Sequence, residues 1–425
     1  LEKPIPQKSI VLPPLMKSFY EAVIDAGSSG TRIYLYKVTL APYPVIELIS
    51  HYEFSKTSSG KKEDGLNNFI NPRKKNVVDD ACREVIGPLL KSISLDLEKL
   101  GIERGVTTVN LLATAGMRYA EQHFGKEAVD HLYSLINKFI YQDGYKAGDI
   151  RTSHGSSEEG IWTWVNLNDV YRDIFNDGGT PLGIIEVGGS SLQLSFPSSD
   201  ASNSKNDIYC VEINNRQFNV FCKTYLGLGQ DDARKKMRSS LGPEISAACF
   251  PPGFMAKNDF GDALDGFGTL SLKSDGNYQY QTCNDGYESV IEEIHTSTPL
   301  PKLENEEVEF VGIDGIYHAL KFWDIEESPE KLKELINSKS LNIQNFIDIS
   351  ENEYTQAQCA NATYVNSLLY GRLGLIAKNP KKMICALPNK CKTGKILTWT
   401  RGYLLLKYSK HQATLQSQNN EPKEH

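Results

Sequence analysis

Two short stretches of the sequence place a carboxylate just before a turn of glycine and serine. Asp25 precedes Gly-Ser-Ser-Gly at 27–30, and Glu186 precedes Gly-Gly-Ser-Ser at 188–191. Glycine-rich turns expose consecutive backbone N–H groups, and serine hydroxyls add donors, so each turn is suited to holding phosphate oxygens. A carboxylate next to bound phosphate requires a divalent cation between the two negative groups. The two stretches therefore predict a metal-assisted polyphosphate site.

The two stretches also form an internal repeat. Each runs from an apolar strand through the carboxylate and the turn into a second apolar strand, and the two carboxylates are 161 positions apart, about the size of one domain. We interpret the repeat as two similar domains whose turns face each other and clamp a polyphosphate chain. For either copy alone, a plain glycine-rich hairpin is the alternative.

A third stretch, GSSEEGIWTW at 155–164, supplies two adjacent acids at the start of a predicted helix. Acids in a first helical turn interact favourably with the helix dipole, so we interpret Glu158 as a cap or first-turn charge. Glu159, next to Gly160, is a candidate general base for water. With a polyphosphate as the reactant, the reaction at such a site is phosphoryl transfer. This reaction depends mainly on positioning and charge neutralisation, so it requires no cysteine or histidine nucleophile.

The elements that must position these residues alternate between strands and helices. Apolar runs at 19–24 and 31–38 predict a hairpin around the first turn, and VNLLATAGMRY predicts a strand, a small-residue turn and a helix from Met117. Helical spacing occurs at 76–90, 121–140, 226–241 and 329–337. This alternation predicts α/β layers. We expect the polar tail from His411 to be frayed.

Composition excludes several classes of protein. The chain has 425 residues, 40% hydrophobic and 23% charged, which is typical of a soluble globular protein with two domains. Its net charge of -7 disfavours a nucleic-acid partner. No apolar run approaches the roughly 18 residues of a membrane-spanning helix. Because the chain begins at Leu1 without a methionine, removal of a signal peptide or anchor is compatible with the sequence.

The eight cysteines form no CxxC pair, which argues against a zinc site. Disulfides and buried free thiols are the two alternatives. Cys385 and Cys391 flank a Pro-Asn turn that is suited to bring their sulfur atoms together, and an oxidising compartment would favour such a bond.

Five motifs, in order along the chain, resemble the conserved regions of the apyrases, the ecto-nucleoside triphosphate diphosphohydrolases. The segment TYLGLGQDDA at 224–233 also resembles the segment that follows their fourth region. The resemblance spans nearly the whole chain. The five motifs are VIDAGSSGTR, LLATAGMR, GSSEEGIWTW, IIEVGGSSLQ and WTRGYLL.

The resemblance implies two RNase H-like α/β domains of the actin, sugar-kinase and heat-shock ATPase superfamily, with the active site in the cleft between them. We place domain I at 18–155 plus 398–418, because the C-terminal segment of such proteins returns to the first domain, and domain II at 156–397. Residues 1–17 and 419–425 are expected to be flexible termini.

By the same resemblance, Glu159 is the base that activates water, and Asp25 and Glu186 hold Ca²⁺ or Mg²⁺ largely through bound water. Thr114 and Gln193 match positions near the metal-bound and the attacking water. Arg118 has either a functional or a structural role. Tyr317 and Tyr364 lie in segments where similar proteins place aromatic rings against the nucleobase, and tyrosine is also a common core residue. The remaining phosphate- and nucleotide-binding positions are Ser28, Ser29, Gly30, Thr31, Arg32, Ala115, Gly188, Gly189, Ser190 and Ser191.

The resemblance implies hydrolysis of nucleoside tri- and diphosphates to monophosphate and inorganic phosphate by a secreted or extracellular monomer. The partners expected are nucleoside di- and triphosphates, with no nucleic acid and no membrane span. Glu186 is one methylene longer than the aspartate usual in such proteins. An exopolyphosphatase, a sugar-kinase-like phosphotransferase and a non-catalytic nucleotide-binding lectin or switch are the alternatives.

Overall fold

A computed structural model describes most of the chain. The described residues are 17–28, 30–40, 43–54, 65–70, 78–171, 178–198, 205–251, 276–303, 306–326, 328–339, 357–378, 384–388 and 396–419. Ser29, Cys391 and the two ends at 1–16 and 420–425, on which predictions were made, lie outside this set. Lys17, placed in the flexible N-terminus by the sequence, is instead the first residue of a strand.

The first of two mixed sheets has the strand order β3-β2-β1-β4-β5. Strands β1, β2 and β3 form an antiparallel meander, and β4 and β5 run parallel to β1. Residues 21–26 of β1 are buried without alternation, as in a strand covered on both faces. The strands are β1 (Lys17–Gly27), β2 (Gly30–Leu40), β3 (Pro44–Glu53), β4 (Thr108–Ala113) and β5 (Lys146–Thr152).

The second sheet repeats the first. Its order is β11-β10-β6-β7-β9-β8, which is the same arrangement with β8 added at the meander edge. Strands β6, β7 and β9 form an antiparallel meander, and β10 and β11 run parallel to β6. This repetition confirms the predicted α/β fold with two RNase H-like domains. The strands are β6 (Gly183–Val187), β7 (Ser191–Pro197), β8 (Ile208–Ile213), β9 (Arg216–Leu226), β10 (Phe310–Asp314) and β11 (Ile384–Ala386).

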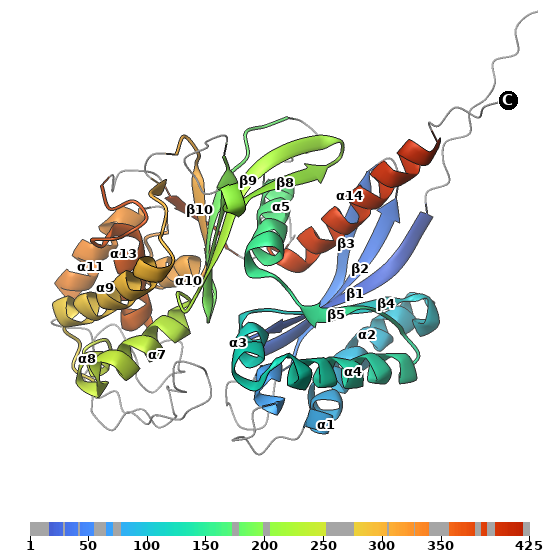
Figure 1. Ribbon diagram of the computed structural model, residues 1–425, viewed down its shortest axis with the longest axis horizontal. Helices are drawn as coiled ribbons and strands as arrows, with labels where there is room; N and C mark the ends of the chain where they lie inside the picture. The colour runs from blue at the N-terminus through green and yellow to red at the C-terminus, as the bar shows by residue number, and fades with distance from the viewer. Residues whose placement is uncertain are drawn as a thin grey trace, which may run out of the picture.

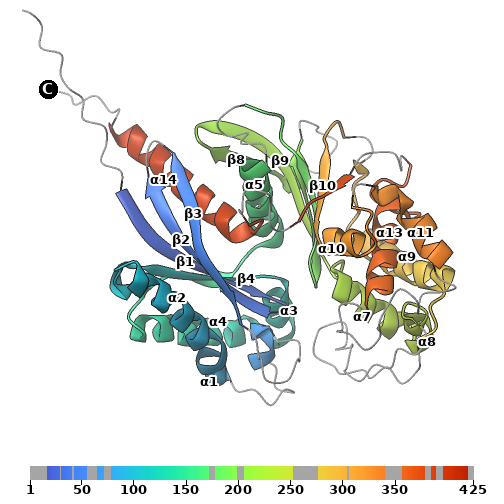
Figure 2. The same cartoon turned by 180° about the vertical axis from the view of Figure 1, so that it is seen from behind.

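Helices cover the outer face of each sheet, as Figures 1 and 2 show from opposite sides. The helices on the first sheet pack against it in one apolar core. The helices on the second sheet pack against it in another. The first set is α1 (Val78–Ala81), α2 (Gly87–Lys99), α3 (Ala115–Phe124) and α4 (Lys126–Gln142). The second set is α7 (Gln230–Leu241), α8 (Pro243–Ala247), α9 (Tyr280–Ser297), α10 (Gly315–Phe322), α11 (Leu332–Lys339) and α13 (Gln358–Tyr370).

Two helices lie between the sheets, namely α5 (Gly160–Tyr171) and α14 (Trp399–Asn419). They pack in a third core together with side chains from both sheets, among them Val23 and Ile184. The helices cross closely, because a Cβ atom at Gly402 would lie 1.9 Å from the carbonyl oxygen of Trp162. Arg401 ties the crossing to β3 and α5 through the Ile46 carbonyl at 3.0 Å and the Asp169 carboxylate at 2.6 Å.

Several element boundaries differ from the sequence prediction. Helix α14 continues to Asn419, so the tail from His411 begins inside a helix rather than as a frayed end. The helix predicted at 226–241 begins at Gln230, because β9 runs to Leu226 and Gly227 has a positive φ of 89°. A short π-helix at Cys82–Ile86 interrupts the helix predicted at 76–90. The boundaries proposed for the two domains remain a prediction.

A disulfide joins Cys249, after α8, to Cys283 in α9. The sequence indicated a disulfide-compatible cysteine content but did not identify this pair. The predicted bond between Cys385 and Cys391 lies outside the described residues, since Cys391 is not among them.

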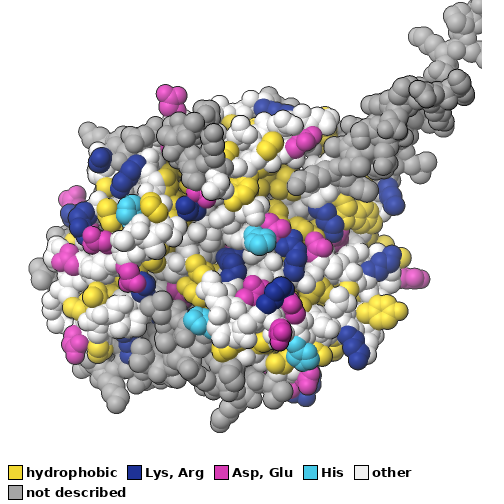
Figure 3. All heavy atoms as spheres, in the orientation of Figure 1, with side chains coloured by type: hydrophobic (Ala, Val, Ile, Leu, Met, Phe, Trp, Pro, Cys, Tyr) yellow, Lys and Arg dark blue, Asp and Glu magenta, His cyan; other side chains and the backbone are white. Residues whose placement is uncertain are grey.

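The described surface is mixed in charge. On the face shown in Figure 3, Lys and Arg side chains are interspersed with Asp and Glu rather than gathered into a basic groove. Within the described ranges, no helix is both long enough and apolar enough to span a bilayer.

Candidate active site

The first predicted phosphate turn is a tight hairpin between β1 and β2. Gly27 pairs with Gly30, which leaves only Ser28 and Ser29 at its tip, and Ser29 lies outside the described residues. A Cβ atom at Gly27 would approach the Gly30 carbonyl oxygen to 3.2 Å, which explains the glycine. Asp25 lies three positions before Ser28, and its register partner on β2 is Arg32.

Arg32 compensates the charge of Asp25 only loosely. Its guanidinium lies 3.9 Å from the Asp25 carboxylate and 2.8 Å from the carboxylate of Glu53. The basic side chain is therefore shared between two acids and is closer to the more exposed one. The hydroxyl of Thr31, the next residue toward the tip, is buried and has no hydrogen-bond partner among the described residues.

A short 3-10 helix at Leu66–Phe69 supports this hairpin, and sequence reasoning missed it. A Cβ atom at Gly65 would lie 2.6 Å from the Gly27 carbonyl oxygen. The Asn67 side chain lies beside the same contact, and its carbonyl oxygen is buried without a partner in the part of the chain that the structure describes. The signal in the sequence is weak, because Gly-Leu-Asn-Asn resembles an ordinary loop.

Thr114 and Ala115 join β4 to α3 beside the first hairpin. The Thr114 N–H donates to the Ala26 carbonyl at 3.1 Å, which ties the helix start to β1. Thr114 occupies the N-cap position, yet its hydroxyl makes no capping hydrogen bond. The hydroxyl therefore does not serve as a helix cap, and its role near a metal-bound water stays a prediction.

The second predicted turn is built like the first. The Gly188 N–H donates to the Ser191 carbonyl at 3.0 Å, and Glu186 pairs with Gln193 across the hairpin. Asp25 and Glu186 are 161 positions apart, as are their cross-strand partners Arg32 and Gln193. The repeat therefore extends from the sequence to the residue register of both hairpins. The Gln193 amide donates to the Ser191 hydroxyl at 2.7 Å.

The segment between β9 and α7 supports the second hairpin. The N–H groups of Gln230 and Asp231 donate to the carbonyls of Gly188 and Gly189, both at 2.9 Å. A Cβ atom at Gly229 would lie 2.3 Å from the nitrogen of Ser190, so only glycine allows this approach. The start of α7 therefore packs against the backbone of the second turn and fixes its conformation.

Glu159 ends a π-turn at Gly155–Glu159 that leads directly into α5. It is 8% exposed, and its carboxylate accepts a hydrogen bond from the Nη1 atom of Arg118 at 2.8 Å. The same nitrogen donates to the Ser153 carbonyl at 3.2 Å. The Nε and Nη2 atoms of Arg118 are buried and have no partner among the described residues. Arg118, for which the sequence left the role open, thus contacts the predicted base directly.

Glu158 behaves differently from its neighbour. Its carboxylate forms a two-point ion pair with Arg151, at 2.7 and 2.8 Å, and accepts the backbone N–H of His154, the N-cap residue, at 2.9 Å. The structure therefore confirms that Glu158 is a first-turn charge with a capping role.

Thr163 connects the predicted base to Glu186. Its hydroxyl oxygen lies 2.9 Å from the Glu186 carboxylate and 2.9 Å from the carbonyl of Glu159, one helical turn earlier. The single hydroxyl proton can serve only one of these acceptors at a time. The sequence could not identify Thr163, because threonine within a helix has many ordinary roles.

The acids of the site interact across the two domains. Burial, the largest cause, raises the pKa of Asp25 to about 7; Arg32 acts in the opposite direction, and the charges of Glu159 and Asp314 raise it further. Burial followed by the charges of Glu159 and Asp314 also raises the pKa of Glu186 well above its ordinary value. The charges of the Asp25 and Glu186 carboxylates are therefore under-compensated as they stand.

Asp314 is a further site residue that was not identified from the sequence. It ends β10 beside Val187 of β6 and has a φ of 56°, an uncommon conformation for a residue other than glycine. A Cβ atom at the following Gly315 would lie 2.7 Å from the Val187 carbonyl oxygen. The signal was present, since FVGIDG is another apolar strand followed by an acid and a glycine.

The donor set fits a hard divalent cation. Carboxylate oxygens and hydroxyls suit Ca²⁺ or Mg²⁺, and a cation would stabilise the ionised form of the buried acids Asp25 and Glu186. Within the described ranges, no group of three or more His, Cys, Asp or Glu side chains is close enough to ligate one ion directly. Contact with an ion through water agrees with both observations.

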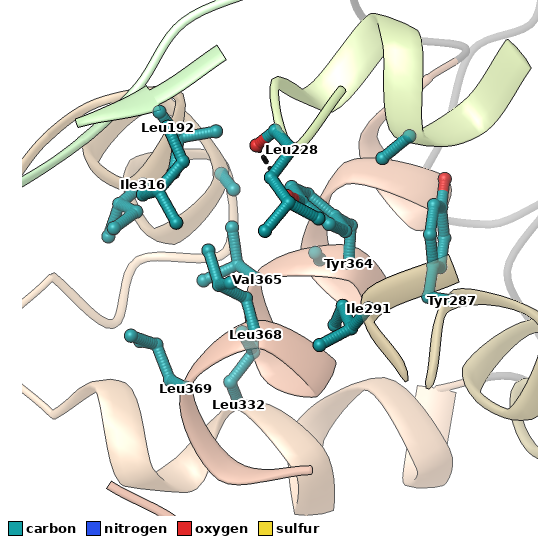
Figure 4. Packing of buried hydrophobic residues seen from close by; sticks show 14 of the residues in the cluster. Leu192, Leu228, Tyr287, Ile291, Ile316, Leu332, Tyr364, Val365, Leu368 and Leu369 are labelled. Atoms are coloured by element: carbon teal, nitrogen blue, oxygen red, sulfur yellow. Dashed lines mark hydrogen bonds between the residues drawn. The ribbon is translucent and has the colours of Figure 1, made fainter. Parts of the chain in front are cut away.

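The two tyrosines predicted to contact a nucleobase lie in different environments. Tyr317 is half-buried on α10, three residues after Asp314. Tyr364 on α13 is 0% exposed, and its hydroxyl donates to the Leu228 carbonyl at 2.6 Å. Figure 4 shows its ring enclosed by the apolar cluster that includes Val365 and Ile291. The structure contradicts the prediction for Tyr364, because packing on both sides leaves no ring face for a base.

Fold and site together define a class: two RNase H-like domains that present paired glycine-serine hairpins, each with an acid, and a glutamate held by arginine. The chain belongs to the GDA1/CD39 (nucleoside phosphatase) family, whose model matches residues 16–420.

Individual relatives agree with this assignment. The chain is 24% identical over 392 residues to "Probable apyrase 5" of Arabidopsis thaliana, covering 84% of this chain and 76% of that protein. It is 24% identical over 436 residues to "Ectonucleoside triphosphate diphosphohydrolase 1" of Bos taurus, covering 90% and 80%. A crystal structure of nucleoside triphosphate hydrolases from Neospora caninum shares the fold, with a TM-score of 0.59, 15% identity and 93% of each chain covered.

Proposed function

We propose that this protein hydrolyses the terminal phosphoanhydride bond of nucleoside tri- and diphosphates, releasing inorganic phosphate and finally the nucleoside monophosphate. Family membership supports the reaction class. The observation that carries the proposal for this chain is the buried Glu159, oriented by Arg118 beside two equivalent hairpins with acids in matching positions.

In the proposed mechanism the terminal phosphate lies between the hairpins. The N–H groups and hydroxyls of Ser28, Gly189 and Ser190 would hold its oxygens. The oxygen of a water molecule forms a new bond to phosphorus as the bond to the bridging oxygen breaks. One proton of that water passes to the Glu159 carboxylate, and the departing nucleotide keeps the bridging oxygen with its electron pair.

A divalent cation, Ca²⁺ or Mg²⁺, held through Asp25 and Glu186, would supply the positive charge that the phosphate oxygens and the buried acids share. The loose contact of 3.9 Å between Arg32 and Asp25 supports this assignment, since the arginine alone does not neutralise the acid. Thr114 and Gln193 have side-chain groups suited to hold the water molecules around such an ion and the attacking water.

Activity in an extracytoplasmic compartment is part of the proposal. It is supported by the disulfide between Cys249 and Cys283, because such bonds persist in oxidising environments. We propose that Tyr317 stacks on the nucleobase, which would tolerate different bases because each has a π-face.

The test is phosphate release from ATP, ADP and other nucleotides, with and without a chelator of divalent cations. Glu159→Gln should lower kcat by about 10²–10⁴-fold, since the amide cannot accept the proton. Glu158→Gln is the matched control, because Glu158 belongs to the same turn but is paired with Arg151. Its activity should stay close to that of the unchanged protein. Equal activity of the two variants, or release insensitive to the chelator, contradicts the mechanism.

A further inference from the structure

Helix α5 is fastened at two places to β6, the strand that carries Glu186. Just before the strand, the Trp164 indole and the Asn168 amide donate to the Leu182 carbonyl at 2.8 and 3.2 Å. The Asn168 side-chain oxygen accepts the Leu182 N–H at 2.7 Å. Near the end of the strand, the Thr163 hydroxyl lies 2.9 Å from the Oε2 atom of Glu186. Thr163 therefore presents its hydroxyl to Glu186 from a helix that is held in place along the strand.

The two acids of the repeat are held by different groups. The cross-strand partner of Asp25 is Arg32, whose guanidinium lies 3.9 Å from the carboxylate. The cross-strand partner of Glu186 is the neutral Gln193, whose amide donates to the Ser191 hydroxyl at 2.7 Å instead. The second acid therefore takes its hydrogen bond from outside its own hairpin, from helix α5.

An ordinary helical role accounts for only one of the two contacts of the Thr163 hydroxyl. Threonine in a helix commonly donates to the carbonyl four residues earlier, and the Thr163 hydroxyl lies 2.9 Å from the Glu159 carbonyl. The contact with Glu186 is additional and joins a different element. Thr163 is 5% exposed, so water competes little for its hydroxyl. Because an ionised acceptor forms the stronger hydrogen bond, the single hydroxyl proton favours Glu186 when its carboxylate is charged.

We propose that Thr163 is a positioning residue for Glu186, because its hydroxyl holds the Oε2 atom and keeps the carboxylate in one orientation for the divalent cation. Glutamate has one more rotatable bond than aspartate, so fixing its side chain in advance lowers the entropic cost of binding. The inference rests on the proposed function, in which Glu186 holds the ion, and adds the residue that orients it.

The experiment measures Ca²⁺ binding by titration calorimetry on nucleotide-free protein at a single pH. Thr163→Val replaces the hydroxyl by a methyl group of similar size, and the dissociation constant for Ca²⁺ should rise about tenfold, as for other groups that orient a metal ligand. Thr163→Ser keeps a hydroxyl and should bind Ca²⁺ nearly as tightly as the unchanged protein. Should the valine variant not fold, Thr163→Ala removes the same hydroxyl with a strong helix former and has the same expected effect.

Thr363→Val is the matched control. Thr363 is also buried in a helix, and its hydroxyl donates to the Cys359 carbonyl at 2.8 Å, four residues earlier. The same hydroxyl lies 3.0 Å from the hydroxyl of Tyr278. The control therefore loses the same kinds of contact, but on α13, in the layer of helices that covers the outer face of the second sheet. Its affinity for Ca²⁺ should equal that of the unchanged protein.

A double-mutant cycle with Glu186→Asp tests the contact itself. The shorter side chain withdraws the carboxylate from Thr163, so Thr163→Val should weaken Ca²⁺ binding much less in this background than in the unchanged protein. Full additivity, unchanged affinity of Thr163→Val, or a loss of affinity in Thr163→Ser as large as in Thr163→Val overturns the positioning proposal alone.

The titrations contain no nucleotide, so the outcome for Thr163 is separate from the outcome for the proposed function. Absence of phosphate release from nucleotides by the unchanged protein overturns the proposed function. An unchanged protein that binds no Ca²⁺ overturns the assignment of the ion to Glu186, and this inference with it.

Discussion

At the scale of single residues, the site is defined by how two similar side chains are paired. Glu158 and Glu159 are neighbours in one turn, but the first is bound by the surface residue Arg151 and the second by the buried Arg118. Pairing with a guanidinium that also holds the Ser153 carbonyl fixes the orientation of the Glu159 carboxylate. A base must present its oxygen to water within hydrogen-bond reach, so orientation is the property that the arginine supplies.

The contrast between Tyr317 and Tyr364 gives a prediction at this scale. Tyr317→Leu should raise the KM for ATP about tenfold, because stacking a base on an aromatic ring contributes about 1–3 kcal/mol. Inorganic tripolyphosphate has no base, so its KM should not change. Tyr364→Phe should leave the KM for ATP unchanged and lower the melting temperature, since it removes a buried hydrogen bond. An equal KM increase for both substrates would contradict base stacking.

At the scale of elements, the two hairpins were predictable because their information is local. A strand, an acid, a glycine-serine turn and a second strand follow one another within about fifteen residues of sequence, and turn chemistry constrains the conformation. The pairing of Arg118 with Glu159 joins residues 41 positions apart on separate elements, α3 and the turn before α5, so no local pattern contains it. The prediction that Tyr364 contacts a nucleobase failed for the same reason, since only tertiary packing distinguishes a core tyrosine from one that binds a ligand.

The close crossing of α5 and α14 supports the segment that carries the proposed catalytic base Glu159. Gly402 is the residue on which this crossing depends. Gly402→Ala would place a Cβ atom 1.9 Å from the Trp162 carbonyl oxygen. Because backbone cannot yield as a flexible side chain does, we expect a loss of about 3 kcal/mol or more in the free energy of unfolding. Activity should fall as well, since α5 continues directly from the turn that carries Glu159.

Gly105→Ala is the matched control for this substitution. Its Cβ atom would come no closer than 3.9 Å to its nearest neighbour, the Gly144 carbonyl oxygen. Chemical unfolding of both variants measures the difference. A Gly402→Ala variant as stable as the control would show that the two helices can separate without cost, contrary to the close crossing.

At the scale of the whole molecule, the site is a surplus of negative charge enclosed by two otherwise complete domains. Each domain has its own apolar core, and the third core, around α5 and α14, joins them. Asp25 and Glu186 come from the central strands of the two sheets, and Asp314 and Glu159 add charge beside them. Bringing the domains together therefore concentrates acids, and a cation would stabilise the assembled form.

This charge surplus predicts a pH-dependent stabilisation by divalent cations. Burial raises the folded-state pKa of Asp25 to about 7, whereas its ordinary value is 3.8. A carboxyl group with a raised folded-state pKa favours the folded state at low pH, and this contribution is lost as pH rises from about 4 through 7. Without a divalent cation, stability should therefore fall across this range. A bound cation replaces the protons, so its effect should be larger at high pH.

Melting temperatures with a chelator and with Ca²⁺ or Mg²⁺, at about pH 5 and about pH 8, measure this linkage. The cation should raise the melting temperature more at the higher pH. Asp25→Asn should reduce the difference between the two pH values, because the neutral amide neither titrates nor attracts the ion strongly. An equal gain at both pH values in the unchanged protein would mean that the ion binds away from the buried acids, and the assignment of Asp25 and Glu186 would then be wrong.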